Sequence, residues 1–469
     1  MSSNLITLIK PRVLPPLDGS FMPAVLWNHA FLDAVRNSKK RIPLSIVIEK
    51  EGSSTSVYKT QVFSPESKFA SLNYFYIERL VKTLLWIYGG YKITINGPAE
   101  IEEYIKKIYS PKNIRAFDAS FMSNIYDKPF TVIICHNKEA FVTKERSIPW
   151  GGHIDGCRIG FDLGASDRKV SAVINGKSVF SEEVIWNPGD KSDPSYHYHE
   201  IMSMLHHAAA HLPRIDAIGG SSAGVYINNR VMAASIFRGI PSDLFEKRVK
   251  NIFLDIQKEW GVPFKVINDG EVTALAGSMS LKVNAVLGIA MGSSEAGGYV
   301  DRKGNITTQL NELAFVPIDF NEQAPIDVWS KDYGCGVQYL SQVAVIRLAE
   351  RAGIIFSEKQ TPAEKLKFVQ KLLAKGDSKV VKIFETIGVY LGYAIAHYAD
   401  FYDLEHILIL GRVTSGEGGH IILQKAIQVL KEEFVELFNK ISIHLPDESI
   451  RRVGQSIAAA SLPLVNSEG

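Results

Sequence analysis

The chain has 469 residues, of which 46% are hydrophobic and 22% are charged; this composition is typical of globular proteins and excludes wholesale disorder. Its 52 Lys and Arg against 50 Asp and Glu leave a formal net charge of +2, which offers no whole-molecule field for nucleic acid or an anionic membrane. No apolar run reaches the roughly 18–20 residues of a membrane span, and no secretory signal is recognisable. We therefore expect a soluble, cytoplasmic protein of about two to four domains, without nucleic-acid or membrane partners.

Residues 1–157 are expected to form an α+β region of their own. Apolar periodicity and turn residues predict strands at 41–50, 56–63, 92–96 and 130–136 and helices at 76–88 and 99–109. We find no catalytic motif here and no compact helix-turn-helix with a basic recognition helix. The expected role of this region is oligomerisation, for example as a homodimer, or a cover over a substrate cleft.

From residue 158 onward strands and helices alternate, which predicts an α/β architecture with sheets covered on both faces. The predicted strands lie at 157–165, 169–174, 216–222, 263–269, 284–292 and 406–411. The predicted helices lie at 199–212, 242–261, 339–353, 378–401 and 453–464. The three cysteines (Cys135, Cys157 and Cys335) are widely spaced and predict neither a disulfide framework nor a four-thiolate metal site.

An aspartate and a glycine stand at the end of the first α/β strand. Asp162 is followed by Gly164 and Ser166 at a tight turn between two predicted strands. Such a hairpin lets backbone N–H groups approach phosphate oxygens closely, and a carboxylate beside it can hold a hydrated Mg²⁺. For this motif taken alone, the alternative is an ordinary glycine turn in which the backbone satisfies the aspartate.

Two later strands also run into small residues. The apolar stretch 286–291 leads into a glycine-rich turn without a Walker lysine, which is either a phosphate-approach turn or a plain β-hairpin. The strand at 406–410 opens into a Gly/Ser loop before a helix, and a helix N-terminus is suited to face a nucleotide. The small residues of the two turns are Gly292 and Ser293, and Gly411, Thr414 and Ser415.

Asn268 and Asp269 lie where a buried strand becomes a helix rich in small residues. A carboxylate in that position can accept a proton from a substrate hydroxyl as the hydroxyl attacks a phosphoryl group. The alternative is that Asp269 caps the N-terminus of the helix. The two roles are compatible with each other.

In order, the chain shows Asp-x-Gly at a hairpin, Asn-Asp at a strand end, a glycine-rich hairpin, and a strand with Gly/Ser before a helix. This order resembles the sugar kinase, actin and heat-shock ATPase superfamily, and Asn268-Asp269 with its small-residue helix looks most like the ROK sugar-kinase family. The small-residue loop that ends at Gly224 stands where that family has a loop before its sugar site, and the C-terminal stretch at 453–462 is similar to its final helix.

The resemblance implies two ribonuclease-H-like lobes around a cleft, at 158–266 and 267–469, after the N-terminal region 1–157, with the last helix crossing back to the first lobe. It implies an ATP- and Mg²⁺-dependent kinase acting on a sugar or sugar-derivative hydroxyl, with Asp269 as general base and Asp162 holding Mg²⁺ through water. The alternative is a sugar- or nucleotide-binding regulatory protein with weak or no turnover. The implied nucleotide-binding residues are Gly164, Ser166, Lys169, Gly292, Ser293, Gly411, Thr414 and Ser415, and the implied sugar-binding residues are Asn268, Glu312 and Gly224.

The chain departs from the ROK pattern in two places that concern the substrate. The family's Glu-x-Gly-His motif reads Glu312-Leu313-Ala314-Phe315 here, so the glutamate is kept and a phenylalanine replaces the histidine. The family's zinc-binding cysteine motif keeps only Cys335. One thiolate cannot hold structural zinc, which usually needs four ligands, and we expect no zinc.

Other polar and aromatic residues have two explanations each. Asp167 would repel a triphosphate unless the basic residues at 168–169 compensate its charge or its side chain points outward. His207 and His211 lie one helical turn apart, as metal ligands do, but packing of the helix on the sheet explains them better. Trp150 offers an aromatic face to a sugar ring or, more simply, anchors the linker at 147–156 against a lobe.

Overall fold

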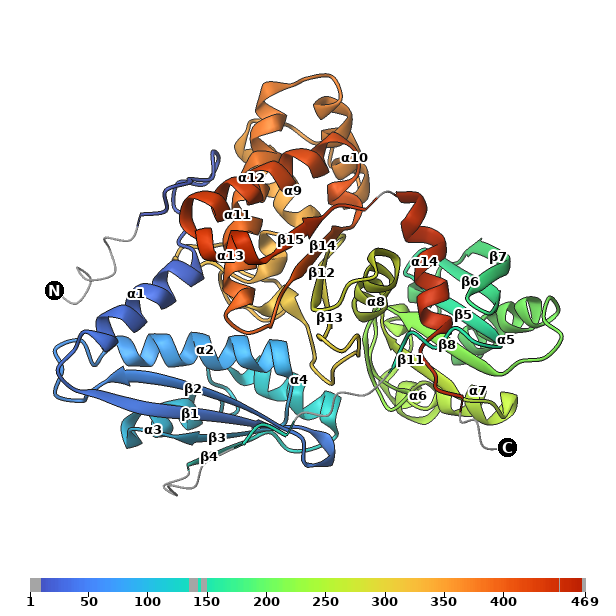
Figure 1. Cartoon of the computed structure of the whole chain (residues 1–469), viewed down its shortest axis with the longest axis horizontal. Helices are drawn as coiled ribbons and strands as arrows, with labels where there is room; N and C mark the ends of the chain where they lie inside the picture. Colours follow the sequence, from blue (N-terminus) through green and yellow to red (C-terminus); the bar gives the residue numbers. More distant parts are fainter. Residues whose placement is uncertain (1–9, 135–141, 145–149, 447, 466–469) are drawn as a thin grey trace.

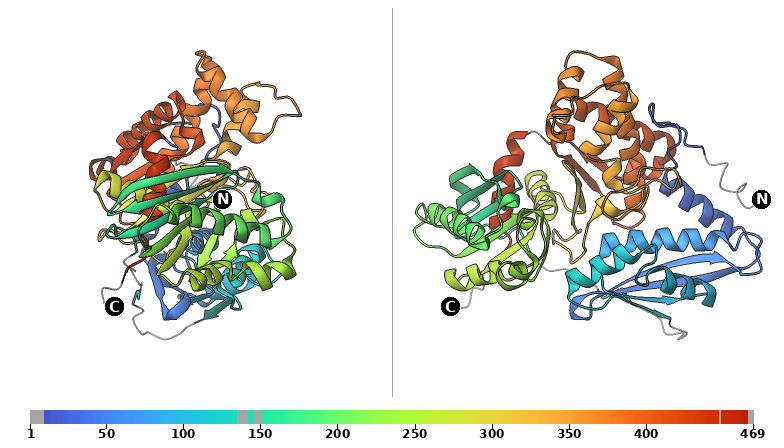
Figure 2. Two further views of the ribbon diagram at one scale, coloured as in Figure 1. Left: turned by 90° about the vertical axis from the view of Figure 1, so that its right-hand side faces the viewer. Right: turned by 180° about the vertical axis from the view of Figure 1, so that it is seen from behind.

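The computed structural model describes residues 10–134, 142–144, 150–446 and 448–465, with only the backbone described for Ser53 and residues 448–453. Figure 1 shows three bodies: an N-terminal α+β region and two α/β lobes. In Figure 2 the same three bodies are distinct when the molecule is seen from behind, whereas in the side view the first lobe lies in front of the N-terminal region.

The N-terminal region is built around a four-stranded sheet in the order β2-β1-β3-β4, in which β1 pairs antiparallel with β2 and β3, and β3 pairs parallel with β4. Its elements are α1 (Ala24–Arg36), β1 (Arg41–Glu49), β2 (Thr55–Phe63), α2 (Leu72–Tyr88), β3 (Lys92–Asn96), α3 (Ala99–Ile108), α4 (Ala116–Tyr126) and β4 (Thr131–Ile134). The predicted strands and two helices are confirmed, although the strand predicted at 130–136 runs on into residues that are not described. Two helices, α1 and α4, were not expected from the sequence.

The apolar core of the N-terminal region continues into the second lobe. Residues such as Phe31 and Leu84 belong to the same buried cluster as Ile387 and Tyr390 of the long helix in that lobe. The ring of Phe21 lies 4.7 Å from the ring of Tyr390, centroid to centroid. Because apolar surface is removed from water along this whole boundary, the region is packed as part of the second lobe and not as a separate module.

Polar contacts at the surface link the N-terminal region to the first lobe as well. Asp127, just after α4, forms ion pairs of 3.0 Å with Arg230 and 2.8 Å with Lys250. Asn228 donates a hydrogen bond of 3.1 Å to Glu51, in the turn between β1 and β2. The N-terminal region therefore contacts both lobes, through a buried apolar core on one side and exposed polar pairs on the other.

The first lobe has a five-stranded sheet in the order β11-β8-β5-β6-β7, in which β5, β8 and β11 are parallel and β6 and β7 are antiparallel. Its elements are β5 (Cys157–Leu163), β6 (Asp167–Ile174), β7 (Lys177–Ile185), α5 (Pro194–Ala209), β8 (Ala217–Ser222), β9 (Val225–Ile227), β10 (Arg230–Ala233), α6 (Ser242–Leu244), α7 (Ile252–Trp260) and β11 (Phe264–Asn268). This order is the ribonuclease-H-like arrangement that the motifs imply. The helix predicted over 242–261 is interrupted by a π-turn at Phe245–Val249, where the carbonyl of Lys250 accepts a hydrogen bond from Val231 of β10.

The second lobe has a four-stranded sheet in the order β13-β12-β14-β15, with helices packed against it. Its elements are α8 (Asp269–Leu281), β12 (Val286–Met291), β13 (Glu295–Val300), α9 (Gln342–Arg351), α10 (Pro362–Leu373), α11 (Ser378–Ala399), β14 (His406–Leu410), α12 (Glu417–Glu433), α13 (Val435–Lys440), β15 (Ser442–His444) and α14 (Glu448–Ala460). Within the described residues, α11 is the one helix long and apolar enough to cross a membrane, and 83% of its most apolar window is buried inside the protein.

The final helix, α14, leaves the second lobe and packs on the sheet of the first, as Figure 1 shows. Gly160 of β5 and Gly219 of β8 are paired side by side under this helix. A Cβ atom on Gly160 would overlap the carbonyl oxygen of Ser456, and one on Gly219 would overlap that of Ala459. The two glycines therefore let the helix backbone approach the sheet, and the predicted crossing is confirmed.

Candidate active site

The carboxyl ends of the parallel strands of the first lobe form one edge of the candidate site. Leu163 at the end of β5 is paired with Ser222 of β8, and Ser222 is paired with Asn268 of β11. Asp162 and Asp269 therefore lie near the same edge of the sheet, two strands or about 10 Å apart at the usual spacing between strands. Two carboxylates that are 107 positions apart in the chain are brought together by strand register alone.

Asn268, and not Asp269, caps helix α8. The side chain of Asn268 accepts a hydrogen bond of 2.7 Å from the N–H of Gly270, and its amide donates 2.8 Å to the carbonyl of Gly224. Asp269 is then the first residue of the helix, half-buried, with one carboxylate oxygen 3.0 Å from the same Gly270 N–H. Burial raises the pKa of Asp269 above its ordinary value, although hydrogen bonds from the backbone oppose the shift.

Asp162 is buried and shares a small network with the first lobe and α14. Its Oδ1 accepts hydrogen bonds of 2.6 Å from Ser221 and 3.4 Å from Gln455. Burial, with a contribution from the charge of Asp269, raises the pKa of Asp162 to about 6, although the hydrogen bond from Ser221 opposes the shift. A hydrated Mg²⁺ fits such a position, because Mg²⁺ is usually held by one or two carboxylates together with substrate phosphates. The described residues contain no group of three or more His, Cys, Asp or Glu arranged to hold a metal without such a substrate.

The first glycine turn joins β5 to β6. The N–H of Gly164 donates a hydrogen bond of 2.9 Å to the carbonyl of Asp167, which closes the hairpin. Lys169 forms an ion pair of 3.1 Å with Asp167, while Arg168 turns away to Glu200 on α5 at 2.7 Å. Lys169 thus neutralises the aspartate that would otherwise repel phosphate. The hydroxyl of Ser166 donates 3.0 Å to the same aspartate.

The glycine-rich β12–β13 hairpin lies against the start of α8. A Cβ on Gly298 of β13 would overlap the carbonyl oxygen of Gly270, and one on Gly270 would overlap that of Gly297. The glycines of β13 therefore let this hairpin approach Gly270, the residue that follows Asp269 in α8. Packing against α8 therefore explains the two adjacent glycines of β13, Gly297 and Gly298. The turn residues Gly292 and Ser293 lie further along, at the tip of the hairpin between β12 and β13.

The third glycine turn follows β14, which is parallel to β12. Ala290 is paired with Leu410, so Gly292 and Gly411 lie beyond neighbouring strand ends. Gly411 has a φ of 104° and no room for a Cβ, which would overlap the backbone of Met291. Thr414 is buried and its hydroxyl donates 3.0 Å to the carbonyl of Gly411, so it shapes the turn. Ser415 follows immediately, one residue ahead of the glycine that precedes α12.

Glu312 is half-buried in a loop between β13 and α9. Burial and the charge of Asp269 together raise the pKa of Glu312 to about 7. The N–H of Glu312 donates 3.0 Å to the carbonyl of Trp86, in the last turn of α2. Phe315, which replaces the family's histidine, stacks on the same Trp86 with ring centroids 4.1 Å apart.

A cavity of about 390 Å³ lies where the N-terminal region and the two lobes meet. The three predicted sugar-binding residues line it, and Asp269, which directly follows Asn268 in the chain, is not itself among the lining residues. The residues that line it include Lys50, Glu51 and Tyr126 from the N-terminal region, Gly224, Lys265 and Asn268 from the first lobe, and Glu271, Thr308 and Glu312 from the second. A cover over the cleft was one of the two roles expected of the N-terminal region, but its individual lining residues were not predicted, because no motif in residues 1–157 marks them.

Trp150 and Lys265 form one wall of this cavity. The ammonium of Lys265 lies 3.5 Å from the centroid of the Trp150 ring, and burial lowers the pKa of Lys265 to about 8. Trp150 also packs against the apolar cluster between the lobes. The packing supports the explanation that Trp150 anchors the linker, while its contact with a sugar ring stays a prediction.

The candidate metal ligands outside this site lie apart from each other. His207 contacts Glu182 at 3.3 Å, whereas His211 stacks on Phe180 at 4.0 Å between ring centroids. Cys335 is buried, and its sulfur lies 3.8 Å from the carbonyl of Asp332. His207 lies near the end of α5, which packs on the sheet of the first lobe as preferred from the sequence, and His211 follows just after this helix.

No family model and no curated protein matches the sequence. Solved structures do match. A ROK family glucokinase from Streptomyces griseus, in complex with glucose and AMPPNP, has a TM-score of 0.51 at 17% identity over 66% of this chain and 99% of that chain. A ROK hexokinase from Thermus thermophilus has a TM-score of 0.51 at 16% identity over 65% and 97% of the two chains.

A ROK family transcriptional regulator, a homologue of the E. coli MLC protein, has a TM-score of 0.54 at 18% identity over 66% of this chain and 79% of that chain. Kinases and a regulator are thus similar to the present chain to about the same degree. At this level of identity the similarity establishes the fold and leaves the activity to the residues of the site. The chain has the two-lobed, actin-like fold of the ROK family sugar kinases.

Proposed function

We propose that this protein is an ATP-dependent kinase that phosphorylates a hydroxyl of a sugar or sugar derivative, with Asp269 as the general base. The observation that carries the proposal is that Asn268, Gly224 and Glu312 line one cavity, and that Asp269 directly follows Asn268 at the start of α8. The glucose and AMPPNP bound by the Streptomyces griseus glucokinase are the ligand classes that such a cavity and the neighbouring glycine turns would take.

In the proposed reaction Asp269 accepts the proton of the sugar hydroxyl as that oxygen attacks the terminal phosphoryl group of ATP. Its raised pKa, caused by burial, makes it a stronger base than a solvent-exposed aspartate. Glu312 accepts a hydrogen bond from a second sugar hydroxyl. Asn268 is already fixed by Gly270 and Gly224, so it holds the geometry of the base and contacts the sugar with its remaining hydrogen-bonding capacity.

The turns at Gly164, Gly292 and Gly411 would receive the phosphates and the nucleotide. Mg²⁺, when bound, would offset the charge of the phosphates, and Asp162 would hold it through water. Asp162 suits this role because it is buried near a second carboxylate, an environment that favours a neighbouring cation.

A regulatory protein that binds sugar without turnover is the second candidate. The replacement of the family's histidine by Phe315 favours it, because the phenyl ring is directed to Trp86 and offers no hydrogen bond to a sugar. The retention of both Asp162 and Asp269 favours the kinase, since binding alone requires no base next to a phosphate turn.

The test is ADP release with D-glucose and N-acetyl-D-mannosamine, for wild type and for Asp269→Asn. Loss of a general base costs about 10²–10⁴-fold in rate, so turnover by the variant should fall by at least about 100-fold while sugar binding, measured by calorimetry, persists. The control is Asp255→Asn, an exposed aspartate on α7 far from the motif. Turnover that survives in Asp269→Asn contradicts the assignment of the base, and sugar binding without any turnover in wild type supports the regulator.

A further inference from the structure

The last turn of α2, in the N-terminal region, is hydrogen-bonded to the loop that carries Glu312. The N–H of Asn311 donates 3.0 Å to the carbonyl of Ile87, and the N–H of Glu312 donates 3.0 Å to the carbonyl of Trp86. The final carbonyls of a helix have no partner within the helix. Here the substrate loop supplies those partners, so the end of α2 and the backbone of Glu312 are fixed to each other.

Gly89 allows this close approach. It follows the last residue of α2 with a φ of 71°, in the left-handed region that favours glycine. A Cβ on Gly89 would lie 2.9 Å from the Cβ of Leu310, in the substrate loop. At Gly89 the chain leaves the helix between Tyr126 of α4 and the substrate loop, where there is no room for a side chain.

Side chains hold the same loop a few residues further on. Phe315 stacks on Trp86 at 4.1 Å with an interplanar angle of 26°. Trp86 is buried, and its indole N–H donates 2.8 Å to Asp118 of α4, which fixes the ring. Phe117 of α4 also contacts Phe315, at 5.8 Å between centroids. The residue that replaces the family's histidine is therefore the one that docks on the N-terminal region.

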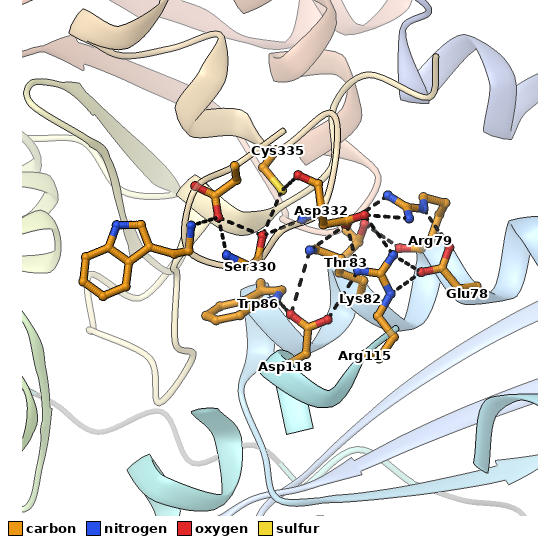
Figure 3. Close-up of polar contacts among 12 residues, drawn as sticks. Glu78, Arg79, Lys82, Thr83, Trp86, Arg115, Asp118, Ser330, Asp332 and Cys335 are labelled. Atoms are coloured by element: carbon orange, nitrogen blue, oxygen red, sulfur yellow. Dashed lines mark hydrogen bonds and ion pairs between the residues drawn. The ribbon is translucent and has the colours of Figure 1, made fainter. Parts of the chain in front are cut away.

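The far end of the loop is anchored by buried charges, drawn in Figure 3. Asp332 forms ion pairs of 2.7 Å with Lys82, 3.1 Å with Arg79 and 2.8 Å with Arg115. Although burial by itself would raise the pKa of Asp332, the three cations lower it well below its ordinary value. Cys335, the remnant of the zinc motif, lies beside this cluster. The charges on α2 and α4 thus hold the segment where the family's metal loop would be.

Glu312 needs such support for an electrostatic reason. Its carboxyl group is half-buried, and burial together with the charge of Asp269 raises its pKa to about 7. Burial and a like charge both disfavour the ionised carboxylate, so a free loop would relax by moving Glu312 into solvent. The backbone bonds at Ile87 and Trp86 and the stacking of Phe315 prevent that movement.

We propose that helix α2 of the N-terminal region positions Glu312 for substrate binding, with Trp86 and Phe315 as positioning residues and the Asp332 charge cluster as the anchor of the loop. The N-terminal region is then part of the sugar site. The inference rests on the proposed function only in naming the ligand of Glu312.

The kinetic test compares Phe315→Leu with Phe31→Leu. Phe31 is a buried ring of the same apolar cluster that stacks on Tyr76 and does not touch the loop. A misplacement of 1 Å can cost about 10²-fold, so we expect Phe315→Leu to raise the KM for D-glucose or N-acetyl-D-mannosamine about tenfold and to leave the KM for ATP unchanged. Phe31→Leu should lower thermal stability comparably and leave both KM values unchanged.

A double-mutant cycle shows whether the effect passes through Glu312. In the Glu312→Gln background, Phe315→Leu should have little further effect on the sugar KM, because the group that it positions has been altered. Additive effects of the two substitutions would overturn the proposal, as would an equal rise of the sugar KM in Phe31→Leu.

Amide hydrogen exchange tests the same claim without any substrate. The proposal predicts that the amides of Asn311 and Glu312 are protected in wild type, that Phe315→Leu accelerates their exchange, and that Phe31→Leu does not. If Phe315→Leu leaves both amides as protected as in wild type, α2 does not hold the loop, whether or not either sugar is phosphorylated. Failure of the kinase assay with normal exchange behaviour would instead refute only the proposed activity.

Discussion

Replacing Lys82 by methionine should destabilise the protein far more than its single charge suggests. The ammonium of Lys82 is fully buried, 2.7 Å from Asp332 and 3.8 Å from Asp118. With Arg79, Arg115 and Glu78 these residues form a cluster of three cations and three anions. Lys82→Met leaves two cations against three anions, so one buried carboxylate loses its counter-charge. Removing one partner of a buried pair costs about 3–5 kcal/mol.

The matched control is Lys92→Met in the same region. The ammonium of Lys92 lies 2.9 Å from Glu49, but both side chains are 30% exposed. Exposed pairs contribute about 0–1 kcal/mol, because water already screens them. The two variants remove the same functional group and differ only in burial.

The assay is urea unfolding followed by circular dichroism, with hydrogen exchange of α2 as a local readout, since a chain of several domains need not unfold in one step. We expect Lys82→Met to lower the free energy of unfolding by about 3–5 kcal/mol and Lys92→Met by less than about 1 kcal/mol. A difference below about 1 kcal/mol between the two would refute the view that the cluster is a dry, charge-balanced anchor.

Three further outcomes are expected. Glu295 is buried, and burial raises its pKa from 4.5 to about 8. Because the folded protein holds this proton more tightly than the unfolded chain, wild type should lose stability relative to Glu295→Gln between about pH 4.5 and 8 in urea titrations. Parallel curves of stability against pH for the two proteins would contradict this. Glu312 has a pKa of about 7, so sugar affinity measured by calorimetry should rise from pH 6 to pH 8 in wild type and stay flat in Glu312→Gln. Gly160→Ala should lower stability by about 1–3 kcal/mol through overpacking against α14, whereas Gly261→Ala, where a Cβ has open space, should act only through its backbone angle.

Much of the two-lobed part of the chain could be predicted from local patterns. Apolar strands that lead into glycine, such as those before Gly224 and Gly411, mark strand ends that face the site in both lobes, because a backbone that must approach another backbone closely admits no side chain. Asn268-Asp269 was identified because a strand that changes into a small-residue helix leaves its polar residues at the sheet edge. The sequence offered Asp269 as the helix cap, and the structure shows that Asn268 is the cap.

The N-terminal region shows where such patterns stop. Its strands and α2 follow from periodicity, but nothing in residues 1–157 indicates that Lys50, Glu51 and Tyr126 face a cavity shared with both lobes. Contacts of this kind join residues far apart in the chain and depend on how complete helices and strands pack against each other. They therefore produce no periodic pattern in the local sequence.

The sequence by itself determined the fold of the lobes, the likeness to ROK kinases, and the loss of the histidine and of the zinc motif. Only the tertiary structure decided what those losses mean. Phe315 and Asp332 are unremarkable along the chain, yet in space they meet Trp86 and Lys82 on one helix. The reason is that a buried ring needs a matching surface and a buried charge needs a counter-charge, and here both partners are supplied by a segment far away in the sequence.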